Sequence, residues 1–264
     1  MVVEPTASAL WRLAGETWAS LLRGHPGATV QLTSHGWLAL SGEPVPDFNL
    51  VYVDEGPAAE EQLREFGQVI RERALPVLVL LARAVADQLA PAARELGLEY
   101  VGGLPLMVYQ VEGAPTERPG SGPYQVEQVN GEEDLRAVHQ LLVSAFGLPL
   151  DSIARFYAPS LLAVPDARLF LTRRLGQPIS TVTTTGAGEI VGIWSMATPP
   201  DQQRQGAGRA TLEAAMAYHR AQGTSTFYLG ATEAGKPLYE RTGFRTLEET
   251  PIWVAGYSAQ FPGH

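Results

Sequence analysis

The spacing of hydrophobic side chains changes several times along the chain, and each change predicts a different element. Leu135, Val138, Leu142 and Phe146 recur at intervals of three or four residues, which is typical of an amphipathic helix. Shorter runs rich in β-branched and aromatic residues, such as TVQLT and TFYLG, predict strands instead. The alternation of the two patterns predicts an α/β fold.

Much the same order of elements is predicted twice. In the first half we expect a helix at 7–23, strands at 29–33, 36–40 and 49–53, a helix at 58–73, a strand at 76–81, a helix at 84–96 and a closing hairpin. In the second half we expect a strand at 124–129, helices at 132–146 and 150–162, strands at 167–173, 178–185 and 189–198, a helix at 206–222, a strand at 226–230, a short helix at 234–242, and two last strands around Phe244 and Trp253. A glycine closing a helix, as at Gly97 and Gly243, is common in any α/β chain, but the shared order favours an internal duplication.

A segment rich in proline, glycine and charge, EGAPTERPGSGP at 112–123, separates the two halves. We therefore expect one domain at 1–115, a linker at 116–123 and a second domain at 124–264.

The composition narrows the classes of function. The 264 residues include no cysteine, which excludes disulfides, thiolate metal sites and a cysteine nucleophile, and we expect no metal. The first 18 residues lack a basic leader and a continuous apolar run, and no stretch of about 18 apolar residues occurs, so we expect a cytoplasmic protein without a membrane span. The net charge is −9, and most of the excess acid lies in the first half. Because an acidic surface repels phosphate backbones, we expect no nucleic-acid partner.

Two glycines one residue apart, Gly206 and Gly208, stand at the start of the predicted helix 206–222. A strand that runs into a glycine loop and then a helix directs several backbone N–H groups at one point, where the helix dipole adds positive charge. Such a point suits a phosphate group, and glycine lets the phosphate approach the backbone. Alternatively, the pair only shapes a turn. The loop has neither the Gly-Lys-Ser/Thr of a Walker loop nor the GxGxxG order of a dinucleotide site.

Two motifs carry a resemblance to a known family. The stretch from Gln203 to Gly208 matches a Q/R-x-x-G-x-G/A signature, with Pro200 three residues earlier, and LYERTGF at 238–244 matches a second signature. In this order, about 35 residues apart, they resemble the GNAT superfamily of acetyl-CoA-dependent N-acyltransferases over roughly 124–257. The resemblance implies two tandem GNAT-like domains, each a mixed, mainly antiparallel sheet flanked by helices.

The resemblance also implies a role for each matching residue. Six loop residues would wrap the pyrophosphate of coenzyme A, mostly through backbone N–H groups. They are Arg204, Gln205, Gly206, Ala207, Gly208 and Arg209. Met196, Ala197 and Thr198 would bond the pantetheine arm like an added strand, and the N–H near Met196 would polarise the thioester carbonyl. Tyr239 would protonate the departing thiolate, which suits a phenol of pKa near 10.

The sequence departs from the family pattern at several positions. Thr232 stands where many relatives have an asparagine that bonds the cofactor arm. Glu189 and Glu233 are the nearest carboxylates for a general base, although solvated surface charges would explain them as well. His139 and His219 are predicted at partly exposed helix positions, and neither is assigned a role.

The first half lacks the features that mark the second. After the strand at 49–53 comes DEGPAAEEQL, with a single glycine, no arginine and four carboxylates, and Ala93 stands at the position that matches Tyr239. We therefore expect a degenerate domain, as in tandem-domain acyltransferases with one silent half. It would line the acceptor pocket or cover a dimerisation surface, so monomer and homodimer both stay open.

These features lead to an enzyme that moves an acetyl group from acetyl-CoA to a small-molecule or peptide amine. Substrate-side residues would come from about 144–165, where Phe146, Phe156 and Tyr157 would line an apolar slot and Asp151 would hold an ammonium group. Core aromatics and a helix N-cap at Asp151 are the alternative interpretation. Two other functions stay open: a non-catalytic acyl-CoA sensor or scaffold, and a structural module in which the glycines only shape a turn.

Overall fold

The computed structural model describes residues 4–111, 123–186 and 188–256. The chain divides into two compact units, the first comprising Met1–Leu106, Gly230–Lys236 and Thr246–His264, and the second Met107–Leu229 and Pro237–Arg245. Two late segments thus belong to the first unit. The division into 1–115, 116–123 and 124–264 stays a prediction about the origin of the domains, and most of the expected linker lies outside the described residues.

The first unit combines several strands of the sheet with helices. Its elements are α1 (Ala7–Leu21), β1 (Thr29–Thr33), β2 (Gly36–Leu40), η1 (Pro46–Phe48), β3 (Asn49–Val53), α2 (Ala59–Arg73), β4 (Val77–Leu81), α3 (Arg83–Glu95), most of β5 (Glu99–Gln110) and nearly all of β11 (Arg245–Ala255). The strand order is β1-β2-β3-β4-β11-β5. Strands β3 and β4 are parallel, whereas β1 with β2, β2 with β3, and β4 with β11 are antiparallel.

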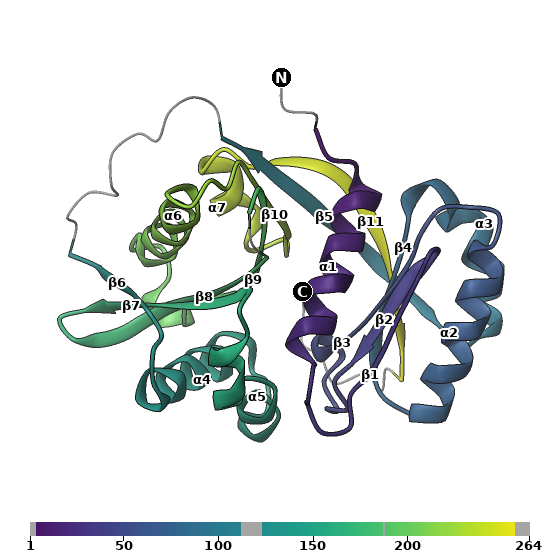
Figure 1. The fold of residues 1–264 in the computed structure, drawn as a ribbon, viewed down its shortest axis with the longest axis horizontal. Coiled ribbons are helices and arrows are strands. Elements are labelled where there is room, and N and C mark those ends of the chain that lie inside the picture. Colours follow the sequence, from purple (N-terminus) through teal and green to yellow (C-terminus); the bar gives the residue numbers. More distant parts are fainter. Residues whose placement is uncertain (1–3, 112–122, 187, 257–264) are drawn as a thin grey trace. The chain divides into compact units, whose positions relative to one another are not determined.

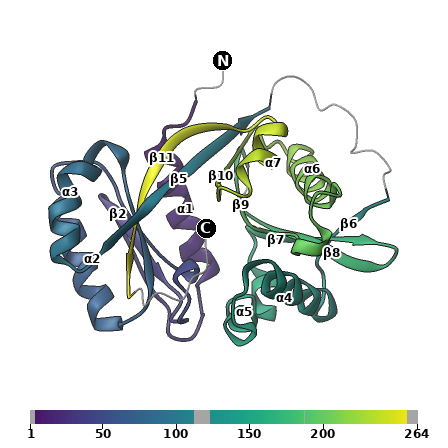
Figure 2. The ribbon, with the colours of Figure 1, turned by 180° about the vertical axis from the view of Figure 1, so that it is seen from behind.

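Alternation along β2 assigns the helices of this unit to opposite faces of the sheet. Trp37 packs on α1, where its ring would lie 2.4 Å from a Cβ at Gly15, and its Nε1 donates to the Trp11 carbonyl at 2.6 Å. The next residue, Leu38, joins the buried cluster with Leu63 of α2 and Leu89 of α3. Figures 1 and 2 show α2 and α3 on the face opposite α1.

The second unit also combines helices and strands. It contains the end of β5, β6 (Gln125–Gln128), α4 (Glu132–Phe146), α5 (Leu150–Phe156), η2 (Pro159–Ala163), β7 (Ala167–Arg174), β8 (Gln177–Thr185), β9 (Ile190–Ala197), η3 (Pro200–Gln202), α6 (Ala207–Arg220), most of β10 (Thr226–Gly230) and of α7 (Lys236–Arg241). The strand order is β5-β10-β9-β8-β7-β6, with β9 and β10 parallel and β6 to β9 antiparallel. The α/β class with a mixed sheet flanked by helices is confirmed, whereas the two tandem domains stay a prediction.

Helices cover both faces of this part of the sheet. On one face the Thr172 hydroxyl meets the Thr211 hydroxyl of α6 at 2.6 Å. The neighbouring residue of β7, Arg173, points the other way and pairs with Asp134 of α4 at 2.6 Å. Figures 1 and 2 show α4 and α5 on the face opposite α6.

Three predicted elements differ from the structure. The closing hairpin of the first half is wrong, because β5 is one strand of 12 residues in which Gly102 (φ 135°) does not turn the chain back. The two last strands are one strand, β11, although it pairs with β4 only from Ile252 onward, after Pro251 has removed a donor. The helix expected at 150–162 ends at Phe156, and Pro159 begins a separate 3-10 turn.

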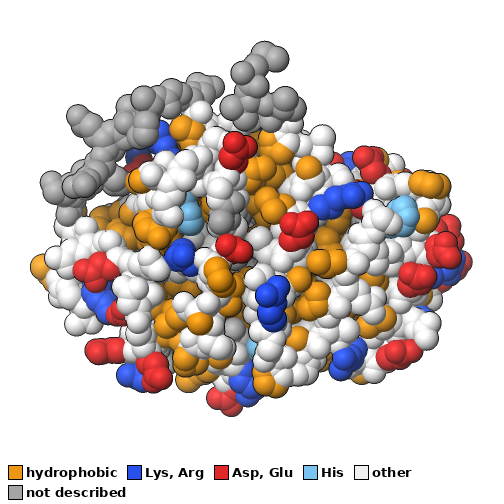
Figure 3. All heavy atoms as spheres, viewed as in Figure 1, with side chains coloured by type: hydrophobic (Ala, Val, Ile, Leu, Met, Phe, Trp, Pro, Cys, Tyr) orange, Lys and Arg blue, Asp and Glu red, His pale blue; other side chains and the backbone are white. Residues whose placement is uncertain are grey.

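Charged side chains of both signs are scattered over the face drawn in Figure 3. Among the described residues, no helix is long and apolar enough to cross a membrane. Within the same residues, no three His, Asp or Glu side chains come together as metal ligands would.

Candidate active site

Strand β9 contains a β-bulge close to its end. Thr183 pairs with Trp194 and Thr181 with Ala197, so Ser195 and Met196 lie opposite a single residue of β8. Ser195 has φ 47°, in the left-handed region. A bulge bends its strand and turns backbone groups out of the ladder, which frees them for other partners.

Beyond the middle of β9, its edge toward β10 is open. The two parallel strands pair only from Ile190 to Gly192 on β9 and from Thr226 to Tyr228 on β10. Strand β9 nevertheless continues to Ala197. Among the described residues, the rest of this edge therefore has no strand partner. An extended molecule can add to such an edge through main-chain hydrogen bonds. Met196, Ala197 and Thr198 lie at the end of this open stretch.

The loop after β9 delivers free backbone N–H groups to one point. Arg204 has φ 63° and Gly206 has φ 93°, and Gly206 is the N-cap of α6. The first hydrogen bond of the helix runs from the Ala210 N–H to the Gly206 carbonyl at 3.0 Å. The N–H groups of residues 206–209 have no acceptor among the described residues. Together with the helix dipole they form a site suited to an anion.

The structure requires glycine at positions 206 and 208 for two different reasons. Gly206 takes a left-handed backbone conformation that L side chains rarely adopt. Gly208 packs closely, because a Cβ there would lie 3.2 Å from Thr198 Oγ1 and 3.3 Å from Met196 Cε. The same Cβ would lie 3.6 Å from Leu238, the neighbour of Tyr239. The end of β9, the start of α6 and the second signature therefore meet at Gly208.

The charges around the loop differ from the sequence expectation. Arg209 is paired with Glu213 at 2.6 Å, which partly neutralises it. Two residues that the sequence analysis did not assign to the loop hold Gln205. Arg174 Nη1 donates to the side-chain oxygen of Gln205 at 2.8 Å, and the Tyr124 hydroxyl donates to the Gln205 carbonyl. Neither belongs to a motif, and only the antiparallel pairing of β6 with β7 brings them together.

Tyr239 is buried on α7 and keeps its proton at neutral pH. Its side chain is 8% exposed, and its ring packs edge-on against Phe244 at 5.8 Å between centroids. Burial raises the pKa of Tyr239 to about 12. Its hydroxyl makes no hydrogen bond to any described residue, so its proton is available to a bound molecule.

Both histidines are buried, which corrects the expectation of exposed helix positions. His139 Nε2 donates to the Tyr157 carbonyl at 2.9 Å. His219 meets Thr184 Oγ1 at 2.8 Å and contacts the rings of Phe170 and Phe227. The spacing of hydrophobic residues did not show this burial, because each histidine is a polar residue at the edge of an apolar stripe.

We expect His219 to make stability depend on pH. Burial, with a smaller effect of Arg168, lowers the pKa of His219 to about 4. The folded pKa lies below the ordinary value near 6.5, so the unfolded chain binds the proton more tightly. Stability should therefore be complete above about pH 6.5 and fall by up to about 3 kcal/mol as the pH drops to 4. Thermal unfolding of wild type and His219→Asn tests this: the variant should lose part of this slope, and an unchanged slope would contradict the assignment.

The remaining candidates for general base and cofactor contact are exposed. Glu189 precedes the first residue of β9, which places it about 20 Å along the strand from the bulge. Glu233 and Thr232 are exposed as well, and the Thr232 hydroxyl accepts from the Gly235 N–H at 3.2 Å. No general base is proposed among them.

Of the residues expected to contact the amine acceptor, some are exposed and others are buried. Phe146 is 45% exposed at the end of α4, whereas Phe156 and Tyr157 are buried and pack edge-on at 5.2 Å. Asp151 is exposed in the first turn of α5. The N-cap of that helix is Pro149, so an N-cap at Asp151 is not what the structure has.

In the first unit the corresponding strands are closed. Strands β3 and β4 pair through their last residues, Val53 and Leu81, and the Ala82 N–H extends the ladder to the Val53 carbonyl at 2.9 Å. Strand β2 pairs with all five residues of β3 in unbroken register. The unit therefore has neither the bulge nor the open edge of β9.

Asp54, the residue after β3, stands where the second unit has the loop between β9 and α6. Asp54 is fully buried and accepts from Ser8 at 2.9 Å, from Arg12 at 2.5 Å and from Tyr52 at 3.0 Å. Burial acts to raise the pKa of Asp54, but these partners and the Glu55 N–H outweigh it and lower the pKa. Asp54 therefore stays charged, which disfavours a phosphate.

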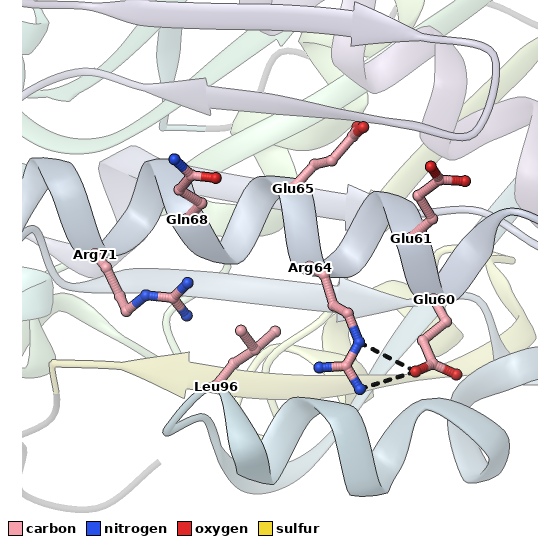
Figure 4. Close-up of a pocket in the computed structure, with 7 residues that line it drawn as sticks. All are labelled: Glu60, Glu61, Arg64, Glu65, Gln68, Arg71 and Leu96. Carbon is pink, nitrogen blue, oxygen red and sulfur yellow. Dashed lines mark hydrogen bonds and ion pairs between the residues drawn. The ribbon is translucent and has the colours of Figure 1, made fainter.

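The surface of α2 carries charges of both signs. A shallow groove along this helix is lined by Glu60, Glu61 and Glu65 together with Arg64 and Arg71, and Figure 4 shows Arg64 turned toward Glu60. Arg64 pairs with both Glu60 and Glu95 at 2.9 Å. Its charge is thus already balanced by carboxylates.

Comparison with known proteins agrees with this geometry. Residues 165–246 match the family model described as an acetyltransferase (GNAT) domain. Residues 165–246 therefore form a GNAT domain within the chain. The matched segment contains all ten residues assigned to the site from sequence.

Solved structures extend the likeness in fold to most of the chain. A GCN5-related N-acetyltransferase from Kribbella flavida is 17% identical with a TM-score of 0.66, and the match covers 93% of this chain and 95% of that one. One from Sphaerobacter thermophilus is 14% identical with a TM-score of 0.60, covering 93% and 90%. A functionally unknown protein from Staphylococcus epidermidis is 14% identical with a TM-score of 0.58, covering 86% and 93%. No curated protein matches the chain.

Proposed function

We propose that the protein is an N-acetyltransferase that moves an acetyl group from acetyl-CoA to the amine of a small molecule or peptide. The proposal rests above all on one observation: the open edge of β9 leads, through the loop at 198–206, to the free N–H groups at the start of α6. An extended pantetheine arm that ends in a pyrophosphate has the shape and charge to match both parts.

The cofactor would be held in two sections. The backbone of Met196, Ala197 and Thr198 would bond the pantetheine arm as an added strand. The pyrophosphate would lie against the N–H groups of the loop residues Arg204, Gln205, Gly206, Ala207, Gly208 and Arg209. Because Arg209 is already paired with Glu213, we assign its contribution mainly to the backbone.

The chemistry needs little beyond positioning and one proton donor. The neutral amine attacks the thioester carbonyl carbon, a C–N bond forms, and the C–S bond breaks. The Met196 N–H would stabilise the oxyanion, and Tyr239 would give its proton to the departing thiolate. Water would carry away the proton that the attacking nitrogen loses and would return a proton to the Tyr239 phenolate. The pKa of Tyr239, raised to about 12 by burial, keeps the donor loaded at neutral pH.

A panel of amines with acetyl-CoA, read by release of free thiol, tests this function. Turnover of at least one amine is expected. Binding of acetyl-CoA without turnover of any amine class would favour the sensor or scaffold instead, and we know of no structural feature that favours that alternative.

The first unit is proposed to be silent toward the cofactor. Its closed strands and the buried Asp54 leave no slot for a pantetheine arm and no site for a phosphate.

A further inference from the structure

Within the second unit, Tyr157 connects helices α4 and α5 to the bulge of β9. It follows α5 directly and is 2% exposed. At its backbone, the carbonyl accepts from His139 Nε2 of α4 at 2.9 Å. At the other end of the residue, its hydroxyl donates to Ser195 Oγ at 2.5 Å. Both ends of the residue are therefore fixed.

The residue that Tyr157 holds is the one with the unusual backbone. Ser195 has φ 47°, a conformation that L side chains other than asparagine and aspartate seldom adopt. It is one of the two bulge residues opposite a single residue of β8. Such a conformation persists only where surrounding contacts impose it. The hydrogen bond from Tyr157 supplies a contact of this kind.

The conformation of Ser195 sets the direction of the next N–H. The peptide group that joins Ser195 to Met196 carries the Met196 N–H, and its orientation follows from the Ser195 backbone angles. If Ser195 relaxed to an ordinary extended conformation, this N–H would turn away from its present direction. The left-handed bulge therefore aims the group that would bond the thioester carbonyl.

We propose that Tyr157 is a positioning residue: its hydroxyl holds Ser195 in the left-handed conformation and so keeps the Met196 N–H directed at the thioester carbonyl. This inference rests on the proposed function. It assigns to Tyr157 a role through Ser195 rather than a contact with the acceptor amine.

The hydroxyl of Tyr157 is suited to a lasting donor role. Burial raises the pKa of Tyr157, although hydrogen bonds with Ser195 and Thr183 lower it in part. The group therefore stays protonated at neutral pH and can keep donating to Ser195. For the same reason it is unsuited to be a general base.

Four variants separate positioning from simple packing. Tyr157→Phe and Ser195→Ala each remove one hydroxyl of the pair. Because the two hydroxyls act as a unit, the double variant should shift the carbonyl band described below no further than either single variant does. Tyr157→Phe combined with Ser195→Gly is the rescue, because glycine adopts positive φ without steric penalty. Thermal unfolding confirms that each variant is folded.

The readout is the carbonyl stretch of bound acetyl-CoA labelled with ¹³C at the acetyl carbonyl, measured by difference infrared spectroscopy together with the Kd of acetyl-CoA. A hydrogen bond lowers this frequency. We expect the band to move back to higher frequency in Tyr157→Phe and Ser195→Ala, and to return toward the wild-type position in the glycine rescue. The Kd should change less than fivefold, because the pantetheine and phosphate contacts remain.

The outcomes distinguish this inference from the proposed function. If wild type does not bind acetyl-CoA, the proposed function and this role are both overturned. If wild type binds and Tyr157→Phe leaves the band unchanged, or the glycine variant fails to restore it, the positioning role is wrong and the proposed function stands.

Discussion

Replacing Gly206 with glutamate should abolish acetyl-CoA binding, raising the Kd at least a hundredfold, or about 2.7 kcal/mol of binding free energy. Gly206 has φ 93° and caps α6, so the new side chain would stand beside the free N–H groups. Its carboxylate would repel a pyrophosphate and occupy the same donors. The strained backbone would also cost about 1–2 kcal/mol of folding stability. Isothermal titration calorimetry measures the binding loss, and thermal unfolding measures the stability loss.

The same helix offers a matched control at its other end. Gly223 has φ 98°, is exposed and has no neighbour within 4 Å of a Cβ. Gly223→Glu adds the same charge and a similar backbone strain about 20 Å away. It should destabilise the fold comparably and leave the Kd of acetyl-CoA within threefold of wild type. If both variants bind acetyl-CoA equally well, Gly206 only shapes a turn.

Replacing Tyr239 with phenylalanine should lower kcat by at least a hundredfold and leave the Kd of acetyl-CoA nearly unchanged. Phenylalanine keeps the ring contact with Phe244, and the hydroxyl makes no hydrogen bond to any described residue. The change therefore removes only the proton donor. The measurement is steady-state turnover with an amine that wild type acetylates.

The pH profile and a second tyrosine give the controls. Because burial raises the pKa of Tyr239 to about 12, the wild-type rate should show no loss near pH 10 from ionisation of this group. Tyr218→Phe changes a half-buried tyrosine near the end of α6 and should leave kcat within twofold. Equal rates for Tyr239→Phe and wild type would contradict the role of proton donor.

Local patterns predicted most of the elements in the described residues. The helix at 132–146 and the strand at 226–230 have the predicted bounds, because one is a clean amphipathic repeat and the other a short apolar run between polar turns. The errors lie where pairing partners are distant in sequence. Strand β11 is a single strand because its second part pairs with β4, about 170 residues earlier.

Only the part of the candidate site that lies within the two sequence signatures could be predicted. The two signatures gave the loop at 203–209 and Tyr239, and the structure adds their meeting point at Gly208. The bulge at Ser195 depends on register against β8, and its contact with Tyr157 joins residues 38 apart. Such contacts leave no periodic signal, so the sequence offers no means to detect them.

The proposed silence of the first unit shows a similar limit. The four carboxylates after β3 and Ala93 suggested a lost site. The closure of β3 on β4 and the burial of Asp54 are a stronger physical reason, and they appear only in three dimensions.

The most direct test of the central claim is a calorimetric titration of the 264-residue chain with acetyl-CoA, read for stoichiometry. The account predicts one binding site per chain, held by the open edge of β9 and the start of α6. Two sites would show that the first unit also binds the cofactor, and no binding at all would contradict the proposed function.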